Sequence, residues 1–223
     1  MKREELTVKA LYDLSMTIAA PLLERVTFPW EALPLIGDFI RELGATLSPE
    51  EYDHPAEDIW IHKSVKPAPT ASLTGPLIIC EGAQVRQCAF IRGNVIIGRG
   101  AVAGNSSEFK NSILFDKVET PHYNYVGDSI LGFKAHMGAG SITSNIKSDR
   151  KNVVIHTGEE DIETGLRKIG AMLGDFAEVG CGSVMNPGAV IGRHSMVYPL
   201  TSVRGTVPAD SIMKREGEIV KKV

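Results

Sequence analysis

Three side chains with cationic or acid–base chemistry stand at regular spacing in the middle of the chain. Arg92 lies eighteen residues before Lys110, and Lys110 lies twelve residues before His122. An Arg and a Lys together suit a dianionic phosphate, because both donate hydrogen bonds to its oxygens. A neutral imidazole suits proton removal near pH 7. These residues are therefore a candidate base and anion site; the alternative is that all three are solvated side chains on turns.

The elements that must position these residues follow a six-residue repeat. From Ile61 to Val207 a small or branched apolar residue recurs at every sixth position. This period fits neither an α-helix nor an alternating strand. It predicts a left-handed parallel β-helix, wound as a prism with one short strand and one tight corner per hexad. Since three hexads make one turn, we expect Arg92 and Lys110 to stack on one corner, with His122 nearby.

The chain divides into three regions, of which residues 1–60 lack the repeat. Apolar residues at helical spacing predict an amphipathic helix over 4–25, and a second short helix covers 35–43 and ends at Gly44. The polar, proline-containing stretch 48–59 is expected to be a connector. The first region is therefore a helical N-terminal segment and linker.

The repeat region, residues 61–207, is interrupted by a charged excursion over 146–168. Long excursions from a regular solenoid are often functional. Residues 208–223 form the third region, a C-terminal cap. We expect a short helix there, because the last coil otherwise leaves unpaired strand edges. The predicted class is mainly β, with helices at the two ends.

Composition narrows the possible partners and locations. The chain has 223 residues, 43% of them hydrophobic, a mean hydropathy of −0.01 and a formal net charge of −3. Without a basic stripe, nucleic acid is not expected as a partner. The apolar stretches are too short for a membrane span, and no secretory signal is evident. We therefore predict a cytoplasmic protein, with Cys80, Cys88 and Cys181 reduced and buried.

Three ordered sequence blocks carry a family resemblance. They read PHYNYVGDS at 121–129, GAGSITSN at 138–145 and TGLRKIGAMLGD at 164–175. Together they resemble the C-terminal acetyltransferase domain of bifunctional N-acetylglucosamine-1-phosphate uridylyltransferase/glucosamine-1-phosphate acetyltransferases. The archaeal-type sugar-1-phosphate nucleotidylyltransferases with an acetylating C-terminal half are more similar still. The match covers most of residues 85–207 and keeps its spacings.

This resemblance implies roles in acyl transfer for four residues. It makes His122 the general base that deprotonates the acceptor amine, and it places the backbone amide of Ala139 against the acyl thioester. The later coils, which contain Cys181 and Ser183, correspond to an acetyl-CoA groove. Corner packing explains these two residues equally well.

The resemblance also implies an acceptor site for an amino-sugar phosphate. Arg92 and Lys110 correspond to the cations that hold the phosphate, Tyr125 and Asn145 to residues that contact the sugar, and Lys151 to a further phosphate contact. Tyr125 is otherwise an aromatic that fills a corner, Asn145 a turn-capping residue, and Lys151 a solvated loop residue. Asn145 could hold either a sugar hydroxyl or the acyl carbonyl.

Departures from the family pattern leave the substrate open. The nucleotidylyltransferase signature is absent from this sequence, so we expect no nucleotidyl transfer. The segment SNIKS at 144–148 replaces CNYDG, and His136 replaces an Asn. Neither the sugar nor the acyl group follows from the sequence.

Two functions are compatible with these observations. The first is an acetyl-CoA-dependent N-acetyltransferase acting on an amino-sugar 1-phosphate, expected to be a homotrimer with sites between subunits. The second is a non-catalytic trimeric scaffold that binds a sugar phosphate or a sugar nucleotide. A carbonic anhydrase on the same fold needs three histidines on zinc, and it is disfavoured because His122 and His136 are fourteen residues apart and no close histidine pair of the expected kind accompanies them. We predict no metal site.

Overall fold

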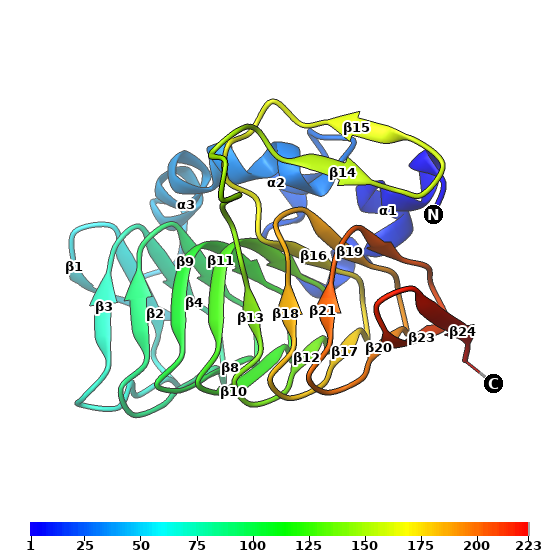
Figure 1. Cartoon of the computed structure of the whole chain (residues 1–223). Helices are drawn as coiled ribbons and strands as arrows, with labels where there is room; N and C mark the ends of the chain where they lie inside the picture. Colours follow the sequence, from blue (N-terminus) through cyan, green and yellow to red (C-terminus); the bar gives the residue numbers. More distant parts are fainter. Residues whose placement is uncertain (223) are drawn as a thin grey trace.

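A computed structural model describes residues 1–222 and shows a parallel β-helix. In Figure 1 the strands on the near side run upward while successive coils advance from left to right. A chain that ascends on the near side while advancing to the right winds with a left hand. The predicted left-handed β-helix is therefore confirmed.

The coil has three sides, which we call the front face, the covered face and the lower face; the lower face is at the bottom of Figure 1. The front face carries β3 (Ser72–Thr74), β6 (Phe90–Arg92), the first halves of β9 (Glu108–Leu114) and β11 (Tyr125–Leu131), β13 (Ile142–Thr143), β18 (Val184–Met185) and β21 (Ser202–Val203). The covered face carries β2 (Ile59–His62), β4 (Leu77–Ile79), β7 (Val95–Ile97), the second halves of β9 and β11, β16 (Ala171–Leu173), β19 (Ala189–Ile191) and β22 (Thr206–Val207). The lower face carries β5 (Gln84–Val85), β8 (Val102–Asn105), β10 (Glu119–His122), β12 (His136–Met137), β17 (Glu178–Val179), β20 (Met196–Val197) and β23 (Ser211–Arg215).

Parallel pairing confirms the predicted turn length. Gln84 pairs with Val102, eighteen residues later, as three hexads require. Glu108 pairs with Tyr125, only seventeen residues later, so the middle coils are one residue shorter. After the excursion Ile130 pairs with Met172, and the regular stacking continues.

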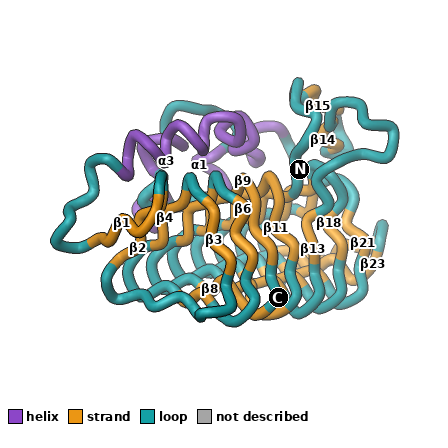
Figure 2. The backbone as a smooth tube through the Cα atoms, turned by 90° about the vertical axis from the view of Figure 1, so that its left-hand side faces the viewer, coloured by secondary structure: helices purple, strands orange, loops and turns teal. Residues whose placement is uncertain are grey.

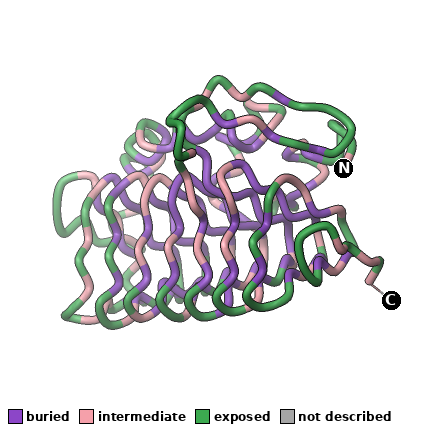
Figure 3. The backbone as a smooth tube through the Cα atoms, in the orientation of Figure 1, coloured by how far each residue is buried: buried purple, intermediate pink, exposed green. Residues whose placement is uncertain are grey.

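The covered face is buried on both sides of its strands. The residues that point outward from it, including Ile78, Ile96, Ile113 and Ile130, have an exposed fraction of 0%. The N-terminal segment packs on them, and Figure 2 shows its helices lying along this side of the coil. Figure 3 shows the strands beneath as buried, whereas the turns at the lower front edge are exposed.

The N-terminal segment is helical but is not the single helix predicted over 4–25. It consists of short turns: η1 (Arg3–Leu6), α1 (Val8–Leu11), η2 (Leu14–Met16) and α2 (Ala20–Leu23). The side chains of Thr7 and Asp13 each accept a backbone N–H and so begin new turns inside the predicted helix. After η3 (Pro29–Leu35), the second predicted helix is confirmed as α3 (Ile36–Gly44).

The two ends of the repeat region are closed by hairpins. Residues 48–59, expected as a connector, include β1 (Tyr52–Ala56), which pairs antiparallel with β2. The predicted C-terminal helix is wrong, because β23 extends the lower face parallel to β20 and β24 (Glu218–Lys221) folds back on it. The edge of β20 leaves backbone N–H and C=O groups unpaired. A strand can pair with them, whereas a helix cannot, because its own backbone groups bond to one another.

The predicted excursion is present and forms a β-hairpin of β14 (Val154–His156) and β15 (Asp161–Glu163). It folds back over the later coils at the corner between the front and covered faces. Gly188 and Gly205 permit this approach: a Cβ on Gly188 would lie 2.7 Å from Val153, and one on Gly205 would lie 2.7 Å from the carbonyl oxygen of His156. The excursion is therefore packed against the coil.

Candidate functional site

The predicted site residues lie along two edges of the front face. The upper front corner, where the front face meets the covered face, includes Asn111, Asp128 and Asn145. The lower front corner, where the lower face meets the front face, includes His122 and Ala139. These two corners are built by different parts of each hexad, so they carry different side chains.

Arg92 and Lys110 are neighbours on successive coils, as their eighteen-residue spacing predicts. Phe90 pairs with Glu108 and Ile91 with Phe109, which puts the next residues, Arg92 and Lys110, side by side at the upper end of the front strands. The Arg92 guanidinium also donates to the Glu108 carboxylate at 2.6 Å, and this hydrogen bond raises the pKa of Arg92. Glu108 therefore offsets part of the positive charge predicted for a phosphate site.

Tyr125 extends its ring along the front face toward the column of side chains formed by Arg92 and Lys110. A Cβ placed on Gly127 would lie 2.5 Å from the Tyr125 hydroxyl oxygen. Gly127 pairs with Lys110 on the neighbouring strand and has no side chain. The Tyr125 hydroxyl therefore fills the space beside Lys110 that a side chain at position 127 would occupy. Burial is the largest cause that raises the pKa of Tyr125, so the phenol stays protonated at neutral pH.

Asn145 joins this group through its side-chain amide. Its Nδ2 donates to the Tyr125 hydroxyl oxygen at 3.2 Å and to the Asp128 carboxylate. We call Arg92, Lys110, Tyr125 and Asn145 the acceptor cluster. The structure thus brings together four of the five residues predicted to bind the acceptor. Lys151 lies apart on the exposed excursion, where its backbone N–H donates to Asp149.

The lower front corner stacks His122, Ala139 and Cys181 on consecutive coils. Gly140 donates its N–H to the carbonyl of His122 at 3.0 Å, and Gly182 donates to the carbonyl of Ala139 at 2.9 Å. The exposed His122 ring has no hydrogen-bond partner within residues 1–222, and neither does the backbone N–H of Ala139. We call these three residues the acyl cluster, which presents a free imidazole beside a free amide.

Buried Asn124 holds this corner in place, a role that the sequence did not indicate. Its Oδ1 accepts the backbone N–H of His122 at 3.1 Å. Its Nδ2 donates to the carbonyls of Gly138 and Ser141 at 2.9 and 3.1 Å. The PHYNYVGDS block is thereby tied to the GAGSITSN block.

Two of the predicted cofactor residues have different environments. Cys181 is exposed, as is Cys88, so the expectation of three buried cysteines is wrong; only Cys80 is buried. Ser183 has an exposed fraction of 0%, and its hydroxyl donates to the carbonyl of Tyr198 and accepts from Thr201. Its side chain packs inside the coil and has no surface with which to contact a ligand.

His136 is a further titratable residue near the acyl cluster. Its Nδ1 lies 3.1 Å from the Glu119 carboxylate on the preceding coil. With Cys181 it lines a shallow cavity of about 360 Å³ on the lower face. The sequence showed His136 only as a departure from the family pattern, because its partner is found only once the seventeen-residue register is known.

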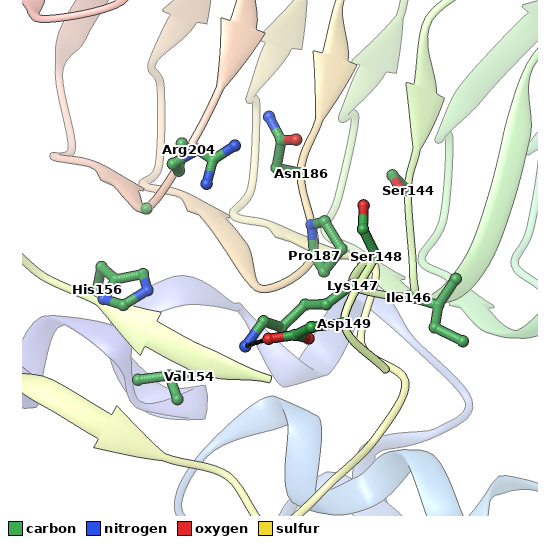
Figure 4. A pocket seen from close by; sticks show the side chains of 11 residues that line it. Ser144, Ile146, Lys147, Ser148, Asp149, Val154, His156, Asn186, Pro187 and Arg204 are labelled. Carbon is green, nitrogen blue, oxygen red and sulfur yellow. Dashed lines mark ion pairs between the residues drawn. The ribbon is translucent and has the colours of Figure 1, made fainter. Parts of the chain in front are cut away.

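A second cavity, of about 350 Å³, lies between the excursion and the later coils. Figure 4 shows Arg204 and Asn186 on the coils and Lys147 and His156 on the excursion. Lys147 is paired with Asp149 at 3.5 Å, whereas Arg204 has no ion-pair partner in the described part of the chain. This cavity continues the column of Arg92 and Lys110 toward the C-terminal coils.

Neither a metal site nor a membrane span emerges from residues 1–222. No group of three or more His, Cys, Asp or Glu side chains is arranged to bind a metal ion within that range. None of its helices combines the length and hydropathy needed to cross a bilayer.

Comparison with known proteins confirms the resemblance on which the site residues were chosen. Residues 73–163 match the family described as the GMPPB C-terminal domain. The "Bifunctional protein GlmU" of Methanococcus maripaludis (strain C5) is 32% identical over 167 residues, which is 67% of this chain and 40% of the relative. The "Bifunctional sugar-1-phosphate nucleotidylyltransferase/acetyltransferase" of Sulfurisphaera tokodaii is 32% identical over 111 residues, covering 50% of this chain and 28% of that protein.

The chain therefore spans less than half the length of these relatives. Among solved structures, PerB from Caulobacter crescentus in complex with CoA and GDP-perosamine is 19% identical. That likeness covers 69% of this chain and 52% of PerB, with a TM-score of 0.35.

Proposed function

We propose that this chain, which is homologous to the C-terminal region of the GlmU proteins, is an acetyl-CoA-dependent N-acetyltransferase acting on an amino-sugar 1-phosphate. One observation carries the proposal: a free imidazole and a free backbone N–H stand on adjacent coils of one corner. A direct acyl transfer needs this pair of groups, a base and an oxyanion donor.

The reaction follows from these two groups. The His122 imidazole takes a proton from the neutral acceptor amine as the amine nitrogen attacks the thioester carbonyl. The Ala139 N–H donates to the oxyanion that forms. When the carbon–sulfur bond breaks, the imidazolium returns the proton to the departing thiolate. The products are an amide and free CoA, and no covalent enzyme intermediate is required.

We propose that the acceptor is held by the acceptor cluster of a neighbouring copy. Within one chain the two clusters lie on opposite edges of the front face. The length of a front-face strand separates them by roughly 10–15 Å. A second chain that packs its lower front corner against this face would bring them together. A homotrimer provides one such site between each pair of neighbours.

Charges in the acceptor cluster fit a phosphate with polar neighbours. Lys110 has no ion-pair partner among residues 1–222, whereas Arg92 forms an ion pair with Glu108. A phosphate dianion adds charge that both cations stabilise, and Glu108 remains close enough to accept from a hydroxyl or an ammonium. This balance favours an amino sugar that carries a phosphate over an uncharged sugar.

Acetyl-CoA would lie along the lower front corner and extend toward the C-terminal coils. The exposed Cys181 and the small residues at this corner leave the wall open for a narrow chain. Arg204 and Lys147, in the cavity at the upper front corner beneath the excursion, would hold phosphate groups of the donor where the long cofactor crosses the front face. Both proposed substrates are soluble metabolites, which agrees with the predicted cytoplasmic location.

The second candidate is a trimeric scaffold that binds a sugar phosphate or sugar nucleotide without reaction. The acceptor cluster is compatible with either function, because Arg92 and Lys110 would hold the same phosphate whether or not a reaction follows. A scaffold would bind the ligand with the same affinity whether or not His122 is present.

Thiol release from acetyl-CoA in the presence of glucosamine 1-phosphate or galactosamine 1-phosphate tests the proposal. We expect turnover with one of them, and we expect His122→Ala to lower kcat about 10²–10⁴-fold, the range for loss of a general base. His194→Ala, at an exposed histidine on another corner, is the matched control and should retain activity. Binding without turnover in the unaltered protein would support the scaffold instead.

A further inference from the structure

Asp128 is a buried carboxylate that contacts the acceptor cluster through Asn145, and the proposed reaction gives it no role. Its exposed fraction is 5%. One carboxylate oxygen accepts from Asn111 Nδ2 at 2.9 Å, and the other accepts from Asn145 Nδ2. Its backbone carbonyl accepts the N–H of Gly170 at 2.8 Å. Asp128 thus contacts residues on both sides of the excursion, where the chain leaves the coil and where it returns.

The chemistry of a carboxylate fixes the orientation of the Asn145 amide. An ionised carboxylate accepts hydrogen bonds and donates none, so the group that faces it must be the NH₂ and not the carbonyl oxygen. The same Nδ2 also donates to the Tyr125 hydroxyl oxygen at 3.2 Å. Both amide protons are therefore used inside the protein, and Asn145 Oδ1 has no donor within the described residues.

We call the hydrogen-bonded series Asp128, Asn145 and Tyr125 the relay. The relay also determines whether the Tyr125 hydroxyl donates or accepts toward a ligand. Its hydroxyl oxygen accepts from Asn145, and no acceptor for its own proton is present among residues 1–222. Since the phenol stays protonated at neutral pH, it is free to donate. The two side chains consequently offer a ligand one acceptor, Asn145 Oδ1, and one donor, the Tyr125 O–H.

We propose that Asp128 is a positioning residue that sets this donor–acceptor pattern, so that the bound ligand must present an O–H or N–H to Asn145 and an acceptor oxygen to Tyr125. The inference rests on the proposed function for the identity of the ligand. It also selects between the two contacts considered for Asn145. A sugar hydroxyl is compatible with Oδ1, whereas an acyl carbonyl, which only accepts, is not.

Asp128→Asn is the sharpest variant for this question. Asp128 has a φ of 48°, in the left-handed region that both Asp and Asn tolerate, and the two side chains have nearly the same shape. The substitution introduces an NH₂ group between Asn111 and Asn145, two residues that already point NH₂ groups at this position. One amide must turn, and Asn145 is then free to present its NH₂ to the ligand. Asn111→Gly is the control, because glycine tolerates the φ of 50° at this position and Asn111 contacts Asp128 but neither Tyr125 nor Asn145 through a hydrogen bond.

The first experiment measures ligand preference by titration calorimetry, which needs no turnover. The ligands are glucosamine 1-phosphate and its monodeoxy and monodeoxyfluoro analogues. Fluorine cannot donate, so at the hydroxyl that faces Asn145 the fluoro analogue should bind the unaltered protein as weakly as the deoxy analogue. Asp128→Asn should weaken glucosamine 1-phosphate about tenfold, the loss of one hydrogen bond, and should reduce the penalty for fluorine. A fluoro analogue that binds as well as the parent sugar at every position would overturn the proposal.

The second experiment tests the relay without any ligand. Burial raises the pKa of Tyr125 most, and the charges of Asp128 and Glu108 raise it further, while the Asn145 hydrogen bond and Arg92 lower it. Removing the Asp128 charge in Asp128→Asn should shift the tyrosine titration, followed by NMR, to lower pH, and Asn111→Gly should not. An unchanged titration would contradict the relay. A shifted titration without binding of the sugar phosphate would support the relay and count against the proposed function.

Discussion

The covered face and the front face are built from the same coils, yet they have opposite surroundings. Covered-face strands read LII, VII, AML and AVI, and both sides of these strands are buried. Front-face strands alternate, as in FIR and EFK, and their outward residues remain accessible. In a solenoid the inward residues maintain the coil on every side. The outward residues therefore reveal which side is core and which side is available for a ligand or a second chain.

The largest expected effect is on stability, at an outward position of the covered face. Ile130→Ala removes a fully buried side chain beneath the N-terminal segment and should lower the free energy of unfolding by about 2–5 kcal/mol. Ile142→Ala, at a half-buried outward position of the front face, should cost less than about 1 kcal/mol. Chemical denaturation of both variants gives the comparison. Equal losses would contradict the assignment of the two faces.

A smaller effect is expected on ligand binding when the front face is altered. Gly127→Ala places a methyl group where the Tyr125 hydroxyl lies, and the ring can turn away because it is the end of a flexible side chain. We expect the KM for the sugar phosphate to rise about tenfold, the loss of one hydrogen bond, with little change in stability. Ser144→Ala, at the next place in the same column, is the control. A marked loss of stability without a change in KM would show that Gly127 serves packing instead.

The smallest effect concerns the contact between the N-terminal segment and the coils. Buried Asp175 accepts the backbone N–H groups of Asp13 and Phe133 at 2.7 and 2.8 Å and pairs with Arg193 at 3.1 Å. Burial is the largest cause that raises the pKa of Asp175 above its ordinary value.

A raised pKa means that the folded state favours the protonated acid. This contribution is fully present below the ordinary aspartate pKa and is lost as the pH rises through the folded-state value. Unfolding measured from pH 3 upward should show this component in the unaltered protein and not in Asp175→Asn. Identical pH profiles would contradict the assignment.

The sequence was sufficient to predict features that repeat locally. The period of six specified the coil, and its eighteen-residue turn placed Arg92 beside Lys110. The interruption after Asn145 marked the excursion. Each of these conclusions depends on residues that are close in sequence or separated by one regular turn.

Features that depend on pairing across coils could not be predicted in this way. The middle coils are one residue shorter, so Glu119 and His136 become neighbours only once this register is known. Glu108 was missed as the partner of Arg92 for a related reason, since the two lie on adjacent coils but not at the regular spacing. The C-terminal hairpin was missed because a helix was expected to cover the open end of the coil, whereas the free edge of β20 favours a strand.

The central claim is that the acyl cluster of one chain works with the acceptor cluster of its neighbour. Co-expression of His122→Ala with the double variant Arg92→Ala, Lys110→Ala, each with its own affinity tag, yields mixed trimers that can be isolated by both tags. Each variant alone should be nearly inactive. In a ring of three, every mixed trimer contains one correctly oriented pair of intact clusters, so we predict about one third of the unaltered activity. Mixed trimers as inactive as their parents would contradict the claim.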